Sequence, residues 1–110
     1  MTTRKLVEYL DMNGNSPFGK WISRLHVHAA VKITTALYRM EQGNFSNAKS
    51  VGGGVFEYKV DFGPGYRIYF GQDGNVLIIL LNGGTKQRQH LDIERSRELW
   101  ADYKTRKRWK

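Results

Sequence analysis

The sequence has no cysteine among its 110 residues and only two prolines. Without cysteine the chain forms no disulfide and offers no thiolate ligand to a metal ion. It also has no apolar run near the roughly 20 residues of a membrane-spanning helix; VLIILL, at Val76–Leu81, has the length of a buried strand. The N-terminus lacks the basic and apolar segments of an export signal, so we expect a cytoplasmic protein without a membrane partner.

Acidic residues are scarce as well. Ten Asp and Glu stand against eighteen Lys and Arg, which gives a net charge of +8. The length suits a single domain over residues 1–110, with one core. So large a positive excess on a short chain favours a polyanionic partner such as nucleic acid, because the field of the protein concentrates anions near its surface. The alternative is a surface charge that only keeps the protein soluble.

The N-terminal half reads as one strand followed by helix. Residues Arg4–Leu10 are rich in β formers and predict a first strand. Ser16 is a suitable helix cap and Pro17 suits the first helical position. Apolar residues then recur at helical spacing as far as Gln42, and Gly43-Asn44 supplies a stop. The pattern predicts a helical pair over Ser16–Gln42, and leaves open whether it is one bent helix or two.

The C-terminal half predicts a sheet and a last helix. Apolar and polar residues alternate over Phe56–Phe62, and the turn Gly63–Gly65 leads into a strand at Tyr66–Phe70. A buried strand follows at Val76–Leu81, while Val51–Gly54 reads as a flexible joint before the sheet. The order β-α-α-β-β-β-α predicts an α+β fold, with two N-terminal helices packed on a mostly antiparallel, twisted sheet and a C-terminal helix.

One strand carries a cation that a plain sheet does not need. If the strands on either side of the Gly63–Gly65 turn pair antiparallel, Lys59 and Arg67 share the solvent-facing side. Like charges that close together favour a phosphate between them, since arginine binds phosphate in a bidentate manner and lysine as a point charge. The alternative is that Arg67 pairs with Glu57 or Asp61 across the hairpin. The pattern alone leaves both open.

The segment after the third of these strands adds basic residues. Lys86, Arg88 and His90 lie two positions apart, so an extended loop would place all three on one side. Cations around a phosphodiester stabilise the charge that grows during its cleavage. Histidine suits proton transfer near neutral pH. For His90 the alternative is an exposed loop residue without a role.

Further polar residues have simpler interpretations. His26 and His28 lie two residues apart on the expected helix, so they point in different directions and do not share a metal ion. Asp92 is interpreted as a helix cap. The carboxylates form no cluster with metal-ligand spacing, so we expect neither a metal ion nor a cofactor.

The chain ends in a basic run, which predicts sequence-independent affinity for nucleic acid. Trp109 within it ends an amphipathic helix in the interpretation we favour. The alternatives are that it packs on the sheet or stacks on a base. The cations of this run are Lys104, Arg106, Lys107, Arg108 and Lys110.

The residues quoted so far also form an ordered pattern. The stretch Gly63–Lys104 resembles the RelE/HigB-like addiction module killer proteins. These are the toxins of type II toxin–antitoxin pairs in the RelE/ParE superfamily. The resemblance rests on motifs that occur in the same order, namely GPGYR, IYF, an apolar strand, GG-x-K and DI…W-x-DY. SPFGKWISRL and GNFSNAKSVGGGVFEYKVDFG also resemble the family, so the likeness covers nearly the whole chain.

The resemblance implies a RelE-like fold and a metal-independent endoribonuclease, an mRNA interferase that inhibits translation by cutting mRNA, typically on the ribosome. It also implies a cognate antitoxin, commonly of the helix-turn-helix type. The toxin would contact operator DNA only through this antitoxin. Arg67 matches the family's arginine at the scissile phosphate, Lys59 falls near a basic position, and Lys86 matches the basic residue after the glycines. Arg88 is a weaker match, grouped with the basic tail as nucleic-acid-binding. Thr85 replaces a common aspartate.

The C-terminal catalytic tyrosine of RelE-type toxins has no clear counterpart, so the proton acceptor is open. His90 is the candidate on chemical grounds. Two other functions stay open: a ParE-like poison that binds DNA gyrase without cutting RNA, and a degenerate toxin that only binds its antitoxin or nucleic acid.

Overall fold

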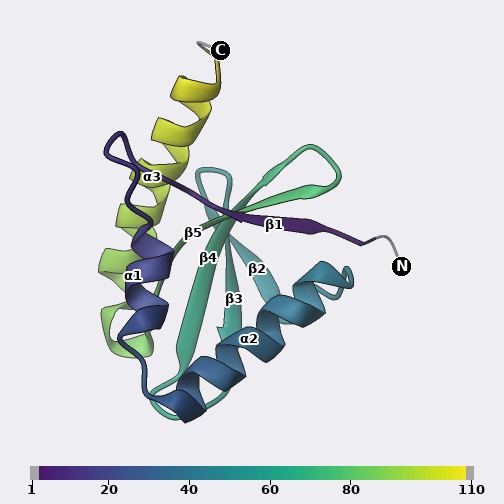
Figure 1. Ribbon diagram of the computed structural model, residues 1–110, viewed down its shortest axis with the longest axis vertical. Coiled ribbons are helices and arrows are strands. Elements are labelled where there is room, and N and C mark those ends of the chain that lie inside the picture. Colours follow the sequence, from purple (N-terminus) through teal and green to yellow (C-terminus); the bar gives the residue numbers. More distant parts are fainter. Residues whose placement is uncertain (1–2, 109–110) are drawn as a thin grey trace.

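The computed structural model describes residues 3–108 as an α+β fold of three α-helices and a five-stranded mixed sheet (Figure 1). The helices and strands, in chain order, are β1 (Lys5–Glu8), α1 (Pro17–Ser23), α2 (Val27–Glu41), β2 (Ala48–Gly52), β3 (Val55–Val60), β4 (Tyr66–Asp73), β5 (Leu77–Thr85), the short 3₁₀ helix η1 (Lys86–Arg88) and α3 (Gln89–Arg108). The predicted class is therefore confirmed, and the helical pair is two helices.

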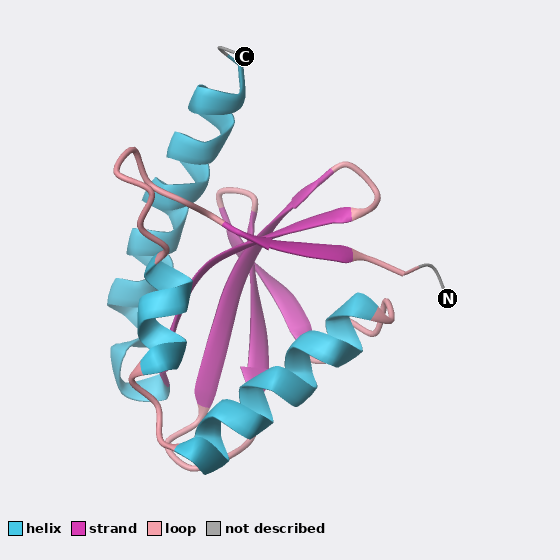
Figure 2. Ribbon diagram, viewed as in Figure 1, coloured by secondary structure: helices cyan, strands magenta, loops and turns pink. Residues whose placement is uncertain are grey.

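The strands lie in the order β1-β5-β4-β3-β2. Three of the four pairings are antiparallel, and β1 runs parallel to β5. Figure 2 shows the twist of this sheet, since β1 and β4 run in clearly different directions. The sheet is thus mostly antiparallel, as the sequence predicts, and β5 has a neighbour on each side.

The helix boundaries follow the capping residues. The Ser16 hydroxyl accepts a hydrogen bond from the backbone N–H of Gly19 at 2.8 Å, and Pro17 opens α1. His26 caps α2, its Nδ1 accepting from the N–H of Ala29 at 3.3 Å. The φ of Gly43, +83°, ends α2 at the predicted stop.

The two faces of the sheet carry different helices. α1 and α2 cover one face, where Phe18 and Ile33 pack on strand residues such as Ile68. α3 covers the other, where Leu99 and Trp100 pack on strand residues such as Ile79. α3 therefore shields part of the face that the alternation in β3 assigns to solvent. Within residues 3–108 no helix is long and apolar enough to cross a membrane.

Two tryptophans explain glycines in the strands. A Cβ added to Gly83 would lie 2.1 Å from the ring of Trp21, and one added to Gly71 would lie 2.4 Å from the ring of Trp100. Both distances are far inside van der Waals contact, so only glycine fits beneath each ring. Each indole thereby fixes its helix, α1 or α3, at one place on the sheet.

Two local predictions are wrong. Residues Ala48–Gly52 form β2, an edge strand paired with β3, whereas the sequence predicts a flexible joint from Val51. Strand β5 continues to Thr85 through Gly83 and Gly84, beyond the predicted end at Leu81. Both segments contain glycines, which pair through the backbone but contribute no apolar side chain. A strand prediction based on the pattern of apolar side chains therefore misses them.

Candidate functional site

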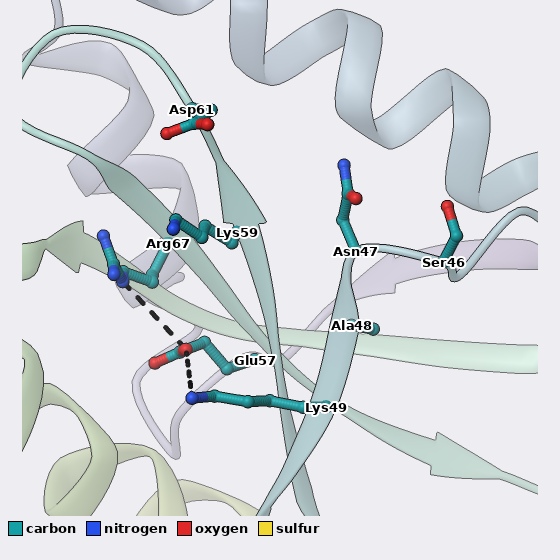
Figure 3. Close-up of a pocket in the computed structure, with 8 residues that line it drawn as sticks. All are labelled: Ser46, Asn47, Ala48, Lys49, Glu57, Lys59, Asp61 and Arg67. Carbon is teal, nitrogen blue, oxygen red and sulfur yellow. Dashed lines mark ion pairs between the residues drawn. The ribbon is translucent and has the colours of Figure 1, made fainter.

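A polar pocket lies on the α3 side of the sheet, beside the outer strands. Its volume is about 360 Å³. Figure 3 shows residues of β2, β3, β4 and the segment before β2 around it. The lining residues are Ser46, Asn47, Ala48, Lys49, Glu57, Lys59, Asp61 and Arg67. We call it the cation cleft, because three of these eight residues are Lys or Arg.

The backbone register brings the two predicted cations together. Lys59 of β3 pairs directly with Arg67 of β4, so both side chains leave the sheet on the same face. This confirms the pairing predicted from the Gly63–Gly65 turn. Lys59 is exposed to solvent, whereas Arg67 is buried.

The prediction that Arg67 faces solvent is wrong. Only 5% of the residue is exposed. Its Nη1 donates to the carbonyl oxygen of Gly65 at 2.7 Å, and its Nε lies 4.0 Å from Glu57 Oε1. That distance exceeds hydrogen-bond length, so among the described residues the Nε has no hydrogen-bond acceptor. The guanidinium is held in place, yet part of its donor capacity is unused.

Glu57 is a candidate functional residue that sequence reasoning did not assign to the site. The alternation in β3 places it in water, but 2% of it is exposed. Its Oε2 accepts a hydrogen bond from Gln89 Nε2 at 2.7 Å, and its Oε1 lies 3.9 Å from Lys49 Nζ. Figure 3 shows this carboxylate between Arg67 and Lys49, joined to each by a dashed line. Its place on the same strand face as Lys59 was the available signal.

The alternative interpretation of Arg67 is thus realised in part. Arg67 pairs with Glu57, yet it still lines the cation cleft beside Lys59 and Lys49. The two carboxylates of the lining, Glu57 and Asp61, do not neutralise its three cations. The cleft therefore keeps a positive excess around the buried carboxylate of Glu57.

Buried polar groups continue from the cleft beneath α3. Tyr69 pairs with Glu57 in the β3–β4 register and is fully buried. Burial, then the charge of Glu57, raises the pKa of the Tyr69 hydroxyl, which therefore stays protonated. Asp92 Oδ2 and Ser96 Oγ are buried nearby in α3 and have no hydrogen-bond partner among residues 3–108.

The prediction that Asp92 caps a helix is wrong. α3 begins at Gln89, so Asp92 lies inside its first turn, where 8% of it is exposed. A Cβ added to Gly84 would lie 1.9 Å from Asp92 Oδ2, so the carboxyl rests on the strand backbone. Burial raises the pKa of this carboxyl, and the charge of Arg88 opposes the rise.

The three basic residues after β5 do not share one side. Lys86 and Arg88 belong to η1 and His90 to the first turn of α3, so a two-residue step turns each side chain away from the last. The N–H of Lys86 donates to the same Gly65 oxygen that Arg67 uses, at 2.9 Å, which places Lys86 beside the cleft. His90 is exposed and its Nε2 lies 3.2 Å from Glu94 Oε1. His90 is not among the residues that line the cleft.

The basic tail is partly neutralised. Arg106 Nε donates to Asp102 Oδ2 at 2.9 Å, and Lys107 binds Asp73. Lys104 is exposed, with its Nζ 5.8 Å from the centre of the Trp100 ring. The side chain of Arg108, with Trp109 and Lys110, lies outside the described residues. Two of the residues predicted to bind nucleic acid therefore already pair with carboxylates of the protein itself.

No three His, Asp or Glu side chains within residues 3–108 lie close enough to share a metal ion. The groups that the cleft offers are ammonium, guanidinium and carboxylate. Together they suit the binding of a phosphate and the transfer of a proton.

Comparison with known proteins shows a relative that matches most of the chain. No protein-family model matches the sequence. A protein of Haemophilus influenzae (strain KW20 / Rd), described only as uncharacterized, is 42% identical over 83 residues. The match covers 74% of this chain and 84% of the relative. The chain therefore belongs to the same family as this H. influenzae protein.

Proposed function

We propose that this protein is the toxin of a type II toxin–antitoxin pair and acts as a metal-independent endoribonuclease. The observation that carries the proposal is the cation cleft, where Arg67, Lys59 and Lys49 lie around Glu57. The net charge of +8 and the resemblance to RelE/HigB-like toxins support a polyanionic substrate. The RelE-like arrangement of the fold, a cytoplasmic location, the ribosome as site of action and a helix-turn-helix antitoxin form part of the same proposal.

In the proposed reaction the RNA phosphate enters the cleft and binds the free donors of Arg67 and the ammonium of Lys59. The neighbouring 2′-OH gives its proton to Glu57 and attacks phosphorus, the P–O5′ bond breaks, and the 5′ oxygen takes a proton from solvent. The products are a 2′,3′-cyclic phosphate and a 5′-OH. The cations stabilise the negative charge that grows on the phosphate oxygens.

Glu57 replaces His90 in the role of proton acceptor for a geometric reason. Glu57 lines the cleft within 4.0 Å of Arg67, whereas His90 is turned toward Glu94 at the surface. A general base must lie within hydrogen-bond reach of the proton that it removes. Lys86, next to Gly65, supplies a further cation at the rim of the cleft.

The test is cleavage of RNA by the purified protein, measured on mRNA with ribosomes and on free RNA in excess chelator. We expect 2′,3′-cyclic phosphate ends from the wild type and a loss of rate of about 100-fold or more from Glu57→Gln. The control is Glu94→Gln, which removes a carboxylate from the surface of α3. Intact RNA together with inhibited DNA gyrase would contradict the proposal and support the ParE-like alternative. Intact RNA with normal growth on expression would support a degenerate toxin.

A further inference from the structure

A second groove adjoins the cation cleft on the opposite face of the sheet. It lies between α2 and β3 and has a volume of about 260 Å³. Lys32, Thr35 and Arg39 line it from α2, and Tyr58 to Phe62 line it from β3 and the residues after it. We call it the α2 groove. It shares three lining residues with the cation cleft, namely Asn47, Lys59 and Asp61.

The two hollows meet because β2 is shorter than β3. Strand β2 begins at Ala48, whose partner is Tyr58, so β3 continues past the end of its neighbour. Beyond that point one backbone bond joins the edge to the preceding loop, from the N–H of Lys59 to the carbonyl oxygen of Asn47 at 3.1 Å. A chain can therefore pass over this edge from one face to the other without meeting a covering strand.

The α2 groove carries cations that the protein itself does not neutralise. Lys32 and Arg39 are exposed, and within residues 3–108 neither forms an ion pair. Lys32 Nζ lies 5.4 Å from the centre of the Phe62 ring, which holds it over the groove. The two residues are seven positions apart on α2, about 10 Å along the axis, so one phosphate does not reach both.

The charges along the combined path favour a polyanion of more than one phosphate. Five cationic residues line it, against the two acidic residues Glu57 and Asp61. The cations are Lys32, Arg39, Lys49, Lys59 and Arg67. A linear polyanion that fills the cleft would continue over the β3 edge, because the next unpaired cations lie there.

We infer that the α2 groove binds the RNA strand that flanks the scissile phosphate, with Lys32 and Arg39 each on a separate backbone phosphate. The inference rests on the proposed function and deepens it. The two residues are binding residues and take no part in the chemical step. They extend the substrate from a single phosphodiester to a single strand of several nucleotides.

The experiment compares Lys32→Ala/Arg39→Ala with a matched control, Lys20→Ala/Arg24→Ala. The control removes two exposed cations of the α1 region that line neither hollow, so both variants lose the same charge. The probes are a 12-nucleotide RNA made uncleavable by 2′-deoxy substitution and a dinucleotide of the same kind. Binding is followed by fluorescence anisotropy over a range of salt concentrations, and circular dichroism confirms that each variant is folded.

For the 12-mer, the slope of log K against log salt should fall by about 0.7 for each phosphate that the variant no longer binds, or about 1.4 for the groove variant. Affinity should fall at least 10-fold more than for the control, while the dinucleotide binds both variants alike. An equal loss in the two variants, or an equal loss with the dinucleotide, would overturn the inference. If the wild type binds the 12-mer with these slopes but leaves cleavable RNA intact both with and without ribosomes, the proposed function fails and the groove stands. If it binds no RNA, both fail.

Discussion

Replacing Arg67 tests how a buried cation serves both the fold and the site. In Arg67→Met the aliphatic stem is kept, but Glu57 stays buried at 2% exposure without its guanidinium partner. Breaking a buried pair in this way destabilises proteins by about 3 to 5 kcal/mol. The lower end applies here, because the pair is 4.0 Å apart and Gln89 and Lys49 still contact the carboxylate. We expect a loss of about 3 kcal/mol in the free energy of unfolding.

The companion variant Glu57→Gln/Arg67→Met removes both charges and keeps both shapes. A neutral amide at position 57 can still pair with Gln89, so most of the lost stability should return, leaving the double variant within about 1 kcal/mol of wild type. Unfolding in urea, followed by circular dichroism, gives the free energies of the wild type, the two single variants and the double variant. Cleavage of RNA is measured on each under conditions where it is folded.

The expected result separates stability from chemistry. The double variant recovers its fold but not its activity, since the phosphate has lost its arginine and the 2′-OH its base. If Arg67→Met is as stable as wild type, the buried pair is not a structural unit. If it is stable and still cuts RNA at the wild-type rate, Arg67 does not bind the scissile phosphate, and the proposed mechanism is refuted.

Three further predictions follow from the geometry. Gly83→Ala forces a methyl group to 2.1 Å from the Trp21 ring. The free energy of unfolding, measured in urea, should therefore fall by about 1 to 3 kcal/mol. An unchanged unfolding midpoint would contradict this packing of Trp21 on Gly83. Burial raises the pKa of Asp92, so the stability linked to its neutral form is present below the ordinary pKa of about 3.9 and is lost as pH rises through the folded value. Asp92→Asn should therefore raise Tm at about pH 7 and lose this advantage in acid. A gain in Tm that does not vary with pH would argue against a raised pKa at Asp92. His90→Ala should leave both the rate and the pH profile of RNA cleavage unchanged, because the imidazole faces Glu94 outside the cleft; a loss of about 100-fold would restore it as the proton acceptor.

The sequence predicted the parts of the fold that depend on local chemistry. Ser16 and Pro17 mark the start of a helix by capping and by a fixed φ, and both act as expected. The Gly63–Gly65 turn fixes the register that sets Lys59 opposite Arg67. These features involve neighbours in the chain or one short hairpin, so a single sequence contains enough information for them.

The burial of side chains on a face of the sheet depends on which helix covers that face, and this could not be predicted from local sequence. Alternation in β3 shows that Glu57 and Lys59 share a side, but it does not show that α3 comes to rest over one of them and leaves the other in solvent. Likewise the two-residue spacing of Lys86 and His90 has meaning only if the backbone is extended there. A helix begins at Lys86 instead, which separates the side chains.

The burial of Arg67 favours its proposed role as a phosphate ligand, although it overturns the expectation of an exposed side chain. An exposed arginine must lose side-chain entropy when it binds an anion, whereas Arg67 is already held by Gly65 and the strand register. Its Nε meets no hydrogen-bond acceptor among residues 3–108, and Glu57 at 4.0 Å is too distant to satisfy it. Because Arg67 also lines the cleft, a phosphate there would meet a guanidinium that is already held in place, beside the carboxylate of Glu57. The Arg67–Glu57 pair thus fixes both the guanidinium and the proposed base. The two residues should therefore fail together in catalysis and compensate each other in stability.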